Sequence, residues 1–470
     1  MFRTEGMRIR DEYGRQRIFK GINLCFKYDR MSAHIINKWH KHIDEVLDAL
    51  CDNGVNIIRL GFTWAALEPE ENEYDQRMFD FLKFFVDKCR ERGIYIVLDT
   101  HQDLFCSKFK FGDGAPEWVT RDYARKSPVA IWAEGYFYVR DVQRAFNDFW
   151  RNKNDIQSKF IKLWGVICDE FKDYENVIAL DYLNEPMITD NSNKVFCTLV
   201  NNAVKVGLNK DFHAERYFEN GRERSGFLRM ALAIALKVRT IGNLKKFLKA
   251  IDDYDAFSKI VDSLEQYTED FNSEYFQPFI DEVSKNRCNE NCIALFEHNY
   301  YSNLGVPFTI EPGDNYVYSP HAYDLFIDSA LYNSYSSNAR VKYILDSIRQ
   351  NQLKMNVPVI MGEWGGSAHK GNEWIKHVDY VYSLIEKNQW SSIYWNYLYQ
   401  NKEFTRVMNR PYPCAVCGDI VEYSSNSESR HFALSYICND NTAPTIVYVP
   451  DKGYVEYSNT IGENIIEIDY

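Results

Sequence analysis

The chain has 470 residues, of which 45% are hydrophobic and 26% are charged, a composition typical of a globular protein with a large core. Its 55 Lys and Arg residues stand against 67 Asp and Glu residues, so the formal net charge is −12. A chain with this balance has no overall basic field that would attract a phosphate backbone, and nucleic acid is excluded as an expected partner.

Signals for membrane insertion and export are weak. No run approaches the ~20 consecutive apolar residues that a membrane-spanning helix needs, and the nearest run, residues 227–238, contains Arg229 and Lys237. The first residues lack the apolar segment of a secretory signal, so we expect a cytoplasmic protein unless a leader has been removed. The 11 cysteines are irregularly spaced, which favours reduced thiols and no zinc site. We expect a monomer with no metal and no cofactor.

Short apolar, β-branched runs alternate along most of the chain with stretches whose apolar residues recur at helical spacing. One helical stripe contains Ile43, Leu47 and Leu50, and another ends before Gly93. This alternation predicts a parallel sheet. The eight predicted strands are residues 18–24, 55–60, 95–99, 177–183, 292–297, 315–320, 357–362 and 392–395.

Eight strand–helix units, with polar residues bunched just after the strands, predict a (β/α)8 TIM barrel, because such barrels build their sites at the carboxyl ends of the strands. An open, doubly wound sheet is the alternative. It is less favoured, since no glycine-rich phosphate loop follows any early strand.

Two segments depart from a minimal barrel. The roughly one hundred residues between the fourth and fifth predicted strands are too many for a simple connection, and residues 226–283 have the pattern of several helices. We therefore predict a catalytic barrel over residues 1–412 with a helical insertion at about 187–290. After residue 412 the helical stripes give way to alternating runs such as 445–449, which predicts a small C-terminal β-sandwich domain over 413–470.

Two acidic residues follow distant strands. Glu185 ends the fourth predicted strand and Glu363 ends the seventh, so both carboxylates are expected at the same face of the barrel. Glycoside hydrolysis needs such a pair, with one carboxyl protonated to assist the leaving oxygen and the other ionised. Carboxyl groups ~5 Å apart would give retention of configuration through a covalent glycosyl-enzyme.

Other strand ends carry residues that would complete such a site. Arg59, at the end of strand two, would hold the nucleophile ionised, and Tyr323 would donate a hydrogen bond to Glu363. Trp395, the last residue of strand eight, suits a sugar-stacking platform. A metal site built from His101, Asp103, His321 and Glu363 is an alternative, but His-Glu-x-x-His is absent; a serine hydrolase is disfavoured because Gly-x-Ser-x-Gly is absent.

Several of these motifs are familiar. Asn184-Glu185-Pro186, His321-Ala322-Tyr323 and Gly362-Glu363-Trp364-Gly365 resemble the corresponding strand ends of glycoside hydrolase family 5, whose members are retaining (β/α)8 barrels. Within that family, the stretches 99–105, 112–118 and 409–418 resemble the endoglycoceramidases and their endogalactosylceramidase relatives. This similarity covers nearly the whole chain, including the C-terminal β domain.

The resemblance implies cleavage of the β-glycosidic bond between the glycan and the ceramide of glycosphingolipids. Glu185 would then be the acid/base and Glu363 the nucleophile, with Asn184 contacting the sugar 2-hydroxyl. Trp132 would stack beneath a distal sugar. The remaining substrate-binding residues that it implies are Arg59, His101, His321, Tyr323 and Trp395, together with Lys27 and Asp103.

Three other functions stay open. A β-glycosidase acting on glucosyl- or galactosylceramide or on a steryl glucoside would use the same glutamates, as would a soluble cellulase-type endo-β-glucanase. A catalytically inactive carbohydrate-binding barrel is disfavoured because both carboxylates are intact. The apolar face of the insertion around Leu228, Leu232, Ile234 and Leu236 would shelter acyl chains or pack against outer barrel helices. Peripheral membrane contact would depend on apolar surface, since a net charge of −12 gains little from anionic lipid.

Overall fold

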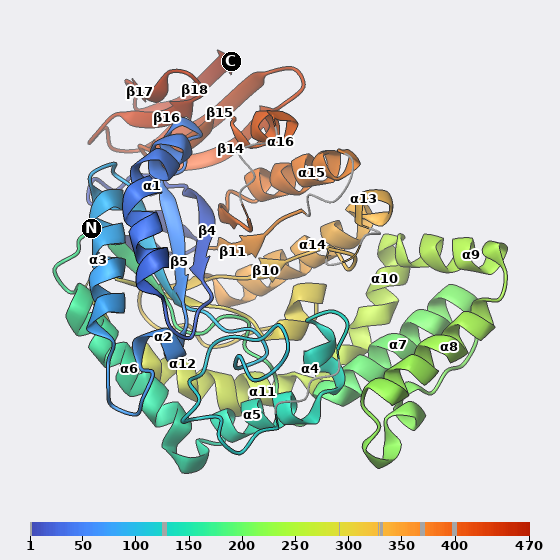
Figure 1. The fold of residues 1–470 in the computed structure, drawn as a ribbon. Helices are drawn as coiled ribbons and strands as arrows, with labels where there is room; N and C mark the ends of the chain where they lie inside the picture. Colours follow the sequence, from blue (N-terminus) through green and yellow to red (C-terminus); the bar gives the residue numbers. More distant parts are fainter. Residues whose placement is uncertain are drawn as a thin grey trace.

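The computed structural model of the protein describes residues 2–124, 129–290, 292–327, 329, 332–366, 372–396 and 402–470. Its centre is a nine-stranded parallel sheet that curls into a barrel (Figure 1), with the strand order β10-β11-β12-β4-β5-β6-β7-β8-β9. These strands are β4 (Lys20–Phe26), β5 (Ile57–Phe62), β6 (Tyr95–Thr100), β7 (Val177–Asp181), β8 (Ile293–Phe296), β9 (Tyr316–Tyr318), β10 (His321–Ala322), β11 (Ile360–Trp364) and β12 (Ser391–Tyr394).

The two ends of this sheet meet. Tyr318 of β9 forms a parallel bridge with Val359, and the Gly362 N–H donates to the carbonyl of Pro320 at 3.1 Å. β9 and β10 are therefore two halves of one sixth strand on either side of Pro320, and the TIM-barrel prediction is confirmed. Each of the eight predicted strands overlaps an observed strand, with ends that differ by up to three residues, whereas the separate short β10 was not predicted.

Amphipathic helices cover the outside of the barrel. The apolar stripe of Ile43, Leu47 and Leu50 is buried on α1, and the side chain of Ser32 caps this helix by accepting the Ile35 N–H. The helices of this layer are α1 (Ala33–Asp52), α3 (Gln76–Arg90), α5 (Arg140–Trp150), α6 (Ile156–Phe171), α14 (Asn338–Met355) and α15 (Glu373–Lys387), with the shorter α2 (Trp64–Leu67), α4 (Glu134–Tyr138), α13 (Tyr332–Tyr335) and α16 (Lys402–Met408).

The long segment between β7 and β8 is helical. It contains α7 (Ser192–Leu208), α8 (Arg224–Val238), α9 (Ile241–Ile251), α10 (Tyr254–Val261), α11 (Glu269–Phe271) and α12 (Gln277–Val283). In Figure 1 α8 and α9 lie at the end of the molecule farthest from the β domain described below. Within the part of the chain that the structure describes, no helix is both long and apolar enough to cross a bilayer.

The C-terminal part forms two antiparallel sheets that share one core. Val416 and Val447 of the first sheet pack in the same cluster as Phe432 and Leu434 of the second, so the domain is a small sandwich. The first sheet contains β1 (Arg3–Glu5), β2 (Arg8–Arg10), β3 (Gln16–Arg17), β13 (Tyr412–Val416), β16 (Thr445–Val449) and β17 (Gly453–Tyr457); the second contains β14 (Asp419–Asn426), β15 (His431–Cys438) and β18 (Gly462–Asp469).

The N-terminal strands belong to this sandwich, although the sequence analysis assigned residues 1–412 to the barrel. β3 pairs with β13 through Gln16 and Val416, which extends the first sheet by β1, β2 and β3. Arg10 reinforces the contact, since its guanidinium donates to the carbonyl of Gly418 at 2.8 Å. The chain thus enters the sandwich before it enters the barrel.

Candidate active site

A buried arginine lies at the floor of the barrel mouth. Arg59, on β5, is completely buried, and four carboxylates surround its guanidinium. These carboxylates are Asp99 at 3.0 Å and Asp181, Glu297 and Glu363 at 2.8 Å each. Burial alone would lower the pKa of Arg59, but the carboxylates raise it well above its ordinary value. Arg59 is therefore a fixed positive charge that holds several strand ends in register.

Glu363 extends from β11 toward this floor. Its Oε1 accepts a hydrogen bond from Arg59 Nη1 at 2.8 Å, and its Oε2 accepts one from the Tyr323 hydroxyl at 2.9 Å. Both donors stabilise a negatively charged carboxylate and leave it aimed into the cavity described below. These are the two contacts that the sequence analysis predicted for Glu363.

Glu185 follows β7 and has an unusual backbone. Its φ of 43° lies in the left-handed region, which is uncommon for a residue with a side chain. The Glu185 N–H donates to Glu297 Oε2 at 2.7 Å, which holds this conformation, and Asn303 Nδ2 donates to Glu185 Oε1 at 2.8 Å. Burial raises the pKa of Glu185, against the opposing effect of His321. Glu185 and Glu363 thus occupy different environments.

His321 connects the two glutamates. Its Nδ1 lies 3.1 Å from Glu185 Oε1 and 3.6 Å from Glu363 Oε2, while its Nε2 lies 3.2 Å from Glu297 Oε1. Burial would lower the pKa of His321, but these carboxylates hold it well above its ordinary value. Carboxylate oxygens of Glu185 and Glu363 lie within 4.8 Å of each other, a separation compatible with retaining glycosidases.

A neutral histidine orients the partner of Glu185. Burial, followed by the charge of His321, lowers the pKa of His298 to about 3. One ring nitrogen of His298 lies 2.8 Å from the Tyr318 hydroxyl and the other lies 2.7 Å from Asn303 Oδ1. This contact fixes the Asn303 amide so that its Nδ2 faces Glu185.

A cavity of about 330 Å³ opens above the two glutamates. Trp395 forms one wall and stacks on His101 with ring centroids 5.5 Å apart and an interplanar angle of 10°. The Lys27 ammonium lies 4.7 Å from the centroid of the Trp395 ring and is paired with Asp103. The lining residues are Lys27, His101, Asp103, Phe111, Asp113, Trp132, Asn184, Glu185, Tyr323, Ile327, Glu363 and Trp395.

Two aspartates share the rim of this cavity. Asp103 and Asp113 are joined by two backbone hydrogen bonds of 3.2 and 2.9 Å. Burial raises the pKa of Asp113 to about 7, and the charge of Asp103 adds to this effect. Lys27 and His101 hold the pKa of Asp103 below its ordinary value despite its burial. Asp113 Oδ1 is buried and finds no hydrogen-bond partner among the described residues, so it is available to a sugar hydroxyl.

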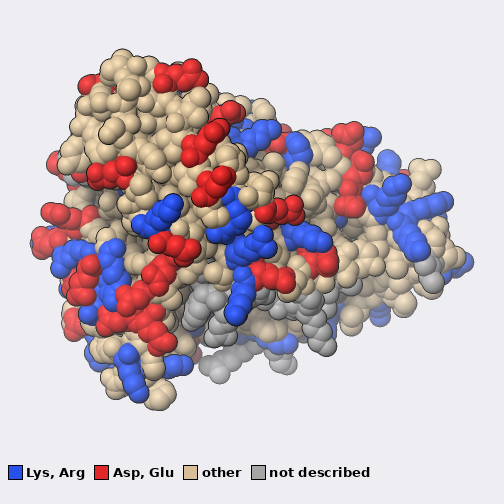
Figure 2. All heavy atoms as spheres, turned by 90° about the horizontal axis from the view of Figure 1, so that it is seen from above, with Lys and Arg blue, Asp and Glu red and all other residues tan. Residues whose placement is uncertain are grey.

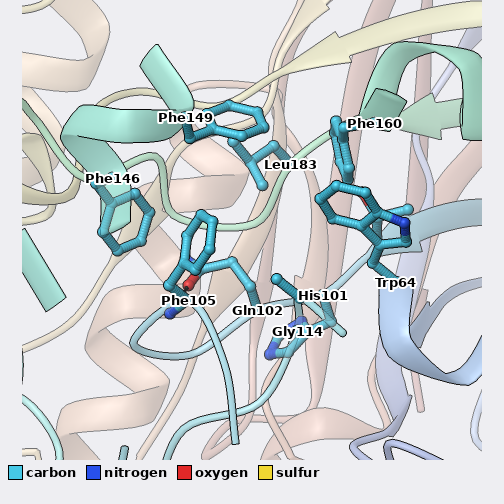
Figure 3. Close-up of a pocket in the computed structure, with 11 residues that line it drawn as sticks. Trp64, His101, Gln102, Phe105, Gly114, Phe146, Phe149, Phe160 and Leu183 are labelled. Atoms are coloured by element: carbon cyan, nitrogen blue, oxygen red, sulfur yellow. Dashed lines mark hydrogen bonds between the residues drawn. The ribbon is translucent and has the colours of Figure 1, made fainter. Parts of the chain in front are cut away.

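Apolar side chains seal the back of the site. His101 and Gln102 help to line a small cavity of about 20 Å³. Figure 3 shows aromatic rings pointing toward it from α5, α6 and the segment after β6. Gln102 Nε2 donates to the carbonyl of Asn184 at 2.8 Å, which ties this wall to the strand end that carries Glu185. The apolar lining residues include Trp64, Phe105, Phe146, Phe149, Phe160 and Leu183. The rear wall of the site is therefore largely apolar.

The structure gathers every sequence-predicted site residue at one mouth. Nine of them line the cavity, while Arg59 and His321 lie beneath it in contact with the glutamates. The sequence analysis missed Glu297, which ends the fifth predicted strand and could have been found by the strand-end rule. It also missed Asn303, which lies in a short 3₁₀ helix and carries no such signal.

The structure does not bring the four residues of the alternative metal site together. Among the described residues, His101 groups with Asp103 and Asp113, whereas His321 groups with Glu185 and Glu363. Glu185 and Glu363 therefore lie beside His321 and not beside His101. The arrangement of the mouth is thus the one that acid-assisted displacement at a sugar requires.

A barrel with a pair of buried carboxylates at its strand ends defines the class of retaining glycosidases, and comparison with known proteins identifies the family. The model of the family described as cellulase (glycosyl hydrolase family 5) matches residues 11–217 and 263–401, and the glycoside hydrolase family 5 C-terminal domain matches residues 410–464. The chain belongs to glycoside hydrolase family 5.

Individual relatives are more distant. An endoglycoceramidase of Cyanea nozakii is 26% identical over 210 residues, which cover 40% of this chain and 41% of the relative. An ergosteryl-β-glucosidase of Saccharomyces cerevisiae is 39% identical over 83 residues, or 16% of this chain and 10% of the relative. The alignments thus span less than half of these relatives.

A solved structure of endo-glycoceramidase II from Rhodococcus sp., in complex with a five-membered iminocyclitol, superposes with a TM-score of 0.66 and 20% identity over 97% of this chain and 98% of that chain. At this identity the likeness shows a shared fold.

Proposed function

We propose that the protein is a retaining glycosidase that hydrolyses the β-glycosidic bond between the glycan and the ceramide of glycosphingolipids. The observation that carries the proposal is the pair Glu185 and Glu363, whose carboxylate oxygens lie within 4.8 Å in contrasting environments. Similarity to a protein named endoglycoceramidase supports the choice of substrate class.

In the first step Glu363 attacks. Its carboxylate oxygen, oriented by Arg59 and Tyr323, forms a bond to the anomeric carbon while the bond from that carbon to the ceramide oxygen breaks. Glu185, whose pKa is raised by burial, gives its proton to the departing oxygen. Ceramide leaves as the alcohol and a glycosyl-enzyme ester remains on Glu363.

In the second step the roles of Glu185 reverse. As a carboxylate it accepts a proton from water, whose oxygen attacks the anomeric carbon and displaces Glu363. The sugar leaves with its original configuration and Glu185 regains its proton. Asn303 and His321 keep the Glu185 carboxyl in place during both steps, because each contacts Glu185 Oε1.

The cavity supports a polar sugar and an apolar aglycone. Lys27, Asp103 and Asp113 present polar groups for sugar hydroxyls, and Trp395 presents a ring face. Phe111, half exposed, and Ile327 contribute apolar surface on the same rim. A substrate with a ceramide tail lies in a bilayer, so we also propose that the enzyme works in contact with a membrane surface.

Two variants test the mechanism. Glu363→Gln should lower kcat on a fluorescent lactosylceramide roughly 10⁴-fold, because the attacking oxygen is lost. Glu185→Gln should also stop glycolipid cleavage, yet a dinitrophenyl glycoside, whose leaving group needs no proton, should still load the enzyme, and azide should restore turnover.

The control for both is Glu422→Gln, an exposed glutamate of β14, which should behave as the wild type. A 2-fluoro glycoside should label Glu363, as read by mass spectrometry of the digested protein. Wild-type glycolipid cleavage in either site variant, or a label on another residue, would refute the assignment.

A second candidate is a β-glucosidase of steryl glucosides. The observation that favours it is the 39% identity over 83 residues with an ergosteryl-β-glucosidase. Incubation with lactosylceramide, glucosylceramide, a steryl glucoside and a cello-oligosaccharide, followed by analysis of the released sugars, separates the candidates. Intact disaccharide from lactosylceramide supports the first proposal, whereas glucose from the steryl glucoside alone supports the second.

A further inference from the structure

The hairpin formed by α8 and α9 has a charge opposite to that of the whole chain. Residues 222–251 contain eight Lys or Arg and a single acidic residue, Glu223, in a protein whose net charge is −12. This segment lies within residues 218–262, which fall between the two matched parts of the family model. The family model therefore does not describe this segment.

Leucines stand exposed on the same hairpin. On α8 the exposed fractions of Leu228, Leu232 and Leu236 are 55%, 61% and 54%, and these residues are spaced by four, so they form one stripe. Leu244 of α9 is also exposed, at 44%. The expectation that these α8 leucines pack against outer barrel helices is wrong, because Met230 and Gly226 take the buried side of the helix instead.

Exposed basic residues of the same hairpin form no ion pair with another described residue. None of the ion pairs recorded among the described residues involves Arg229, Arg239, Lys245, Lys246 or Lys249, all of which are exposed. Figure 2 shows Lys and Arg gathered with uncharged surface at the end of the molecule where α8 and α9 lie in Figure 1. We define the α8–α9 surface as Leu228, Arg229, Leu232, Leu236, Arg239, Leu244, Lys245, Lys246 and Lys249.

The start of α8 contacts the segment that contains α4, near the rim of the cavity. Phe227 of α8 stacks on Tyr138 of α4 with centroids 5.2 Å apart, and Glu223 accepts the Arg140 N–H at 3.2 Å. α4 follows directly after Trp132, which lines the cavity. The start of α8 therefore packs against the helix that follows the cavity-lining Trp132 in the chain.

We propose that the α8–α9 surface docks the protein on bilayers that contain anionic lipid. A stripe of leucines flanked by unpaired cations matches such a bilayer, because the leucines enter the acyl region while the cations meet the headgroup phosphates and carboxylates. This inference rests on the proposed function, because docking would serve to bring the cavity to a substrate that lies in the membrane. It revises the expectation that anionic lipid contributes little to membrane binding. The attraction between the hairpin and the headgroups depends on the local positive charge of the hairpin and not on the net charge of the chain.

Binding to vesicles without any glycolipid tests the docking separately from catalysis. The full chain is mixed with phosphatidylcholine vesicles and with vesicles in which roughly a third of the lipid is phosphatidylserine, and bound protein is separated by flotation. We expect about tenfold or stronger partition onto the anionic vesicles, falling as salt is raised.

Two variants and one control locate the surface. Lys245→Gln/Lys246→Gln/Lys249→Gln should reduce partition onto anionic vesicles about tenfold or more and remove its salt dependence. Leu228→Gln/Leu232→Gln/Leu236→Gln should reduce partition onto both kinds of vesicle. The control, Lys38→Gln/Lys41→Gln/Lys387→Gln, removes three exposed lysines from α1 and α15 and should bind as the wild type.

All variants should hydrolyse a soluble aryl glycoside at the wild-type rate, which verifies that the fold and the site are intact. Lack of binding by the wild type, or equal binding by the lysine variant and the control, would overturn the docking proposal while aryl glycoside hydrolysis leaves the catalytic proposal standing. A second copy of the chain is the other possible partner of this surface, and sedimentation velocity tests for it. A dimer that the leucine variant abolishes, in a protein that does not bind vesicles, would assign the surface to self-association and would also overturn the proposal.

Discussion

The barrel mouth and the α8–α9 surface use charge in opposite ways. At the mouth, Arg59 is completely buried and the carboxylates around it come from the ends of four strands, so the charges are compensated and hold these strand ends in place. On the hairpin, Lys245, Lys246 and Lys249 are exposed and lack recorded partners among the described residues. Compensated charges determine geometry, whereas uncompensated charges create a field that acts on other molecules.

The largest expected effect is a loss of stability when a buried charge, and not an exposed one, is removed. Arg59→Met leaves four buried carboxylates without their cation, and we expect the free energy of unfolding to fall by about 3–5 kcal/mol, with loss of activity. Lys246→Gln removes the same formal charge from the hairpin and should change stability by about 0.5 kcal/mol or less. Urea unfolding followed by circular dichroism measures both. Similar losses in the two variants would show that the hairpin charges are also structural.

A smaller effect is expected from a single neutral donor at the mouth. Tyr323→Phe removes the hydroxyl that donates to Glu363 Oε2 at 2.9 Å, a bond to a charged group worth about 1.5–3 kcal/mol. We expect kcat/KM on an aryl glycoside to fall about 10–100-fold with the unfolding midpoint nearly unchanged. Tyr335→Phe, at an exposed tyrosine of α13, is the matched control and should leave both quantities at wild-type values. An unaltered kcat/KM in Tyr323→Phe would contradict the role given to this hydroxyl.

The rim of the cavity predicts a stability that depends on pH. The folded-state pKa of Asp113 is about 7 against an ordinary value of 3.8, so the folded state binds the extra proton between these values and wild-type stability falls as pH rises through that window. Asp113→Asn cannot lose this proton. We expect it to be about 1–2 kcal/mol more stable than the wild type at pH 8 and equal to it near pH 4.

Thermal unfolding at the two pH values measures this difference, with Asp122→Asn at an exposed loop position as the control that should track the wild type. A constant gap between Asp113→Asn and the wild type at both pH values would mean that Asp113 does not titrate in this window.

The sequence predicted the mouth better than it predicted the hairpin, and the reason is physical. A residue that follows a strand of a parallel barrel must point to one face, so Glu185 and Glu363 could be placed together from position alone. The same rule applies to Glu297, but the sequence does not reveal that its oxygen accepts the Glu185 N–H at 2.7 Å. No such rule predicts Asn303, because the orientation of its amide depends on a contact with His298.

Features that depend on contacts between residues distant in sequence were harder to predict. α8 is apolar on nearly all sides, so its pattern cannot tell which face is covered, and only the packing around Met230 decides this. The strands β1, β2 and β3 are two or three residues long, and they exist because β13 offers them an edge some 400 residues later in the chain. Neither signal is local.

The smallest expected effect is also the sharpest test of the hairpin as a surface. Leu232→Gln on the exposed face of α8 should change the free energy of unfolding by about 0.5 kcal/mol or less, because a side chain that is already 61% exposed gives up little burial. Met230, two residues earlier and only 3% exposed, is the matched position on the buried face, and Met230→Ala should cost about 2–5 kcal/mol. If Leu232→Gln instead destabilised the protein as much as Met230→Ala, the leucine stripe would be covered by protein in solution, and it could not enter a bilayer.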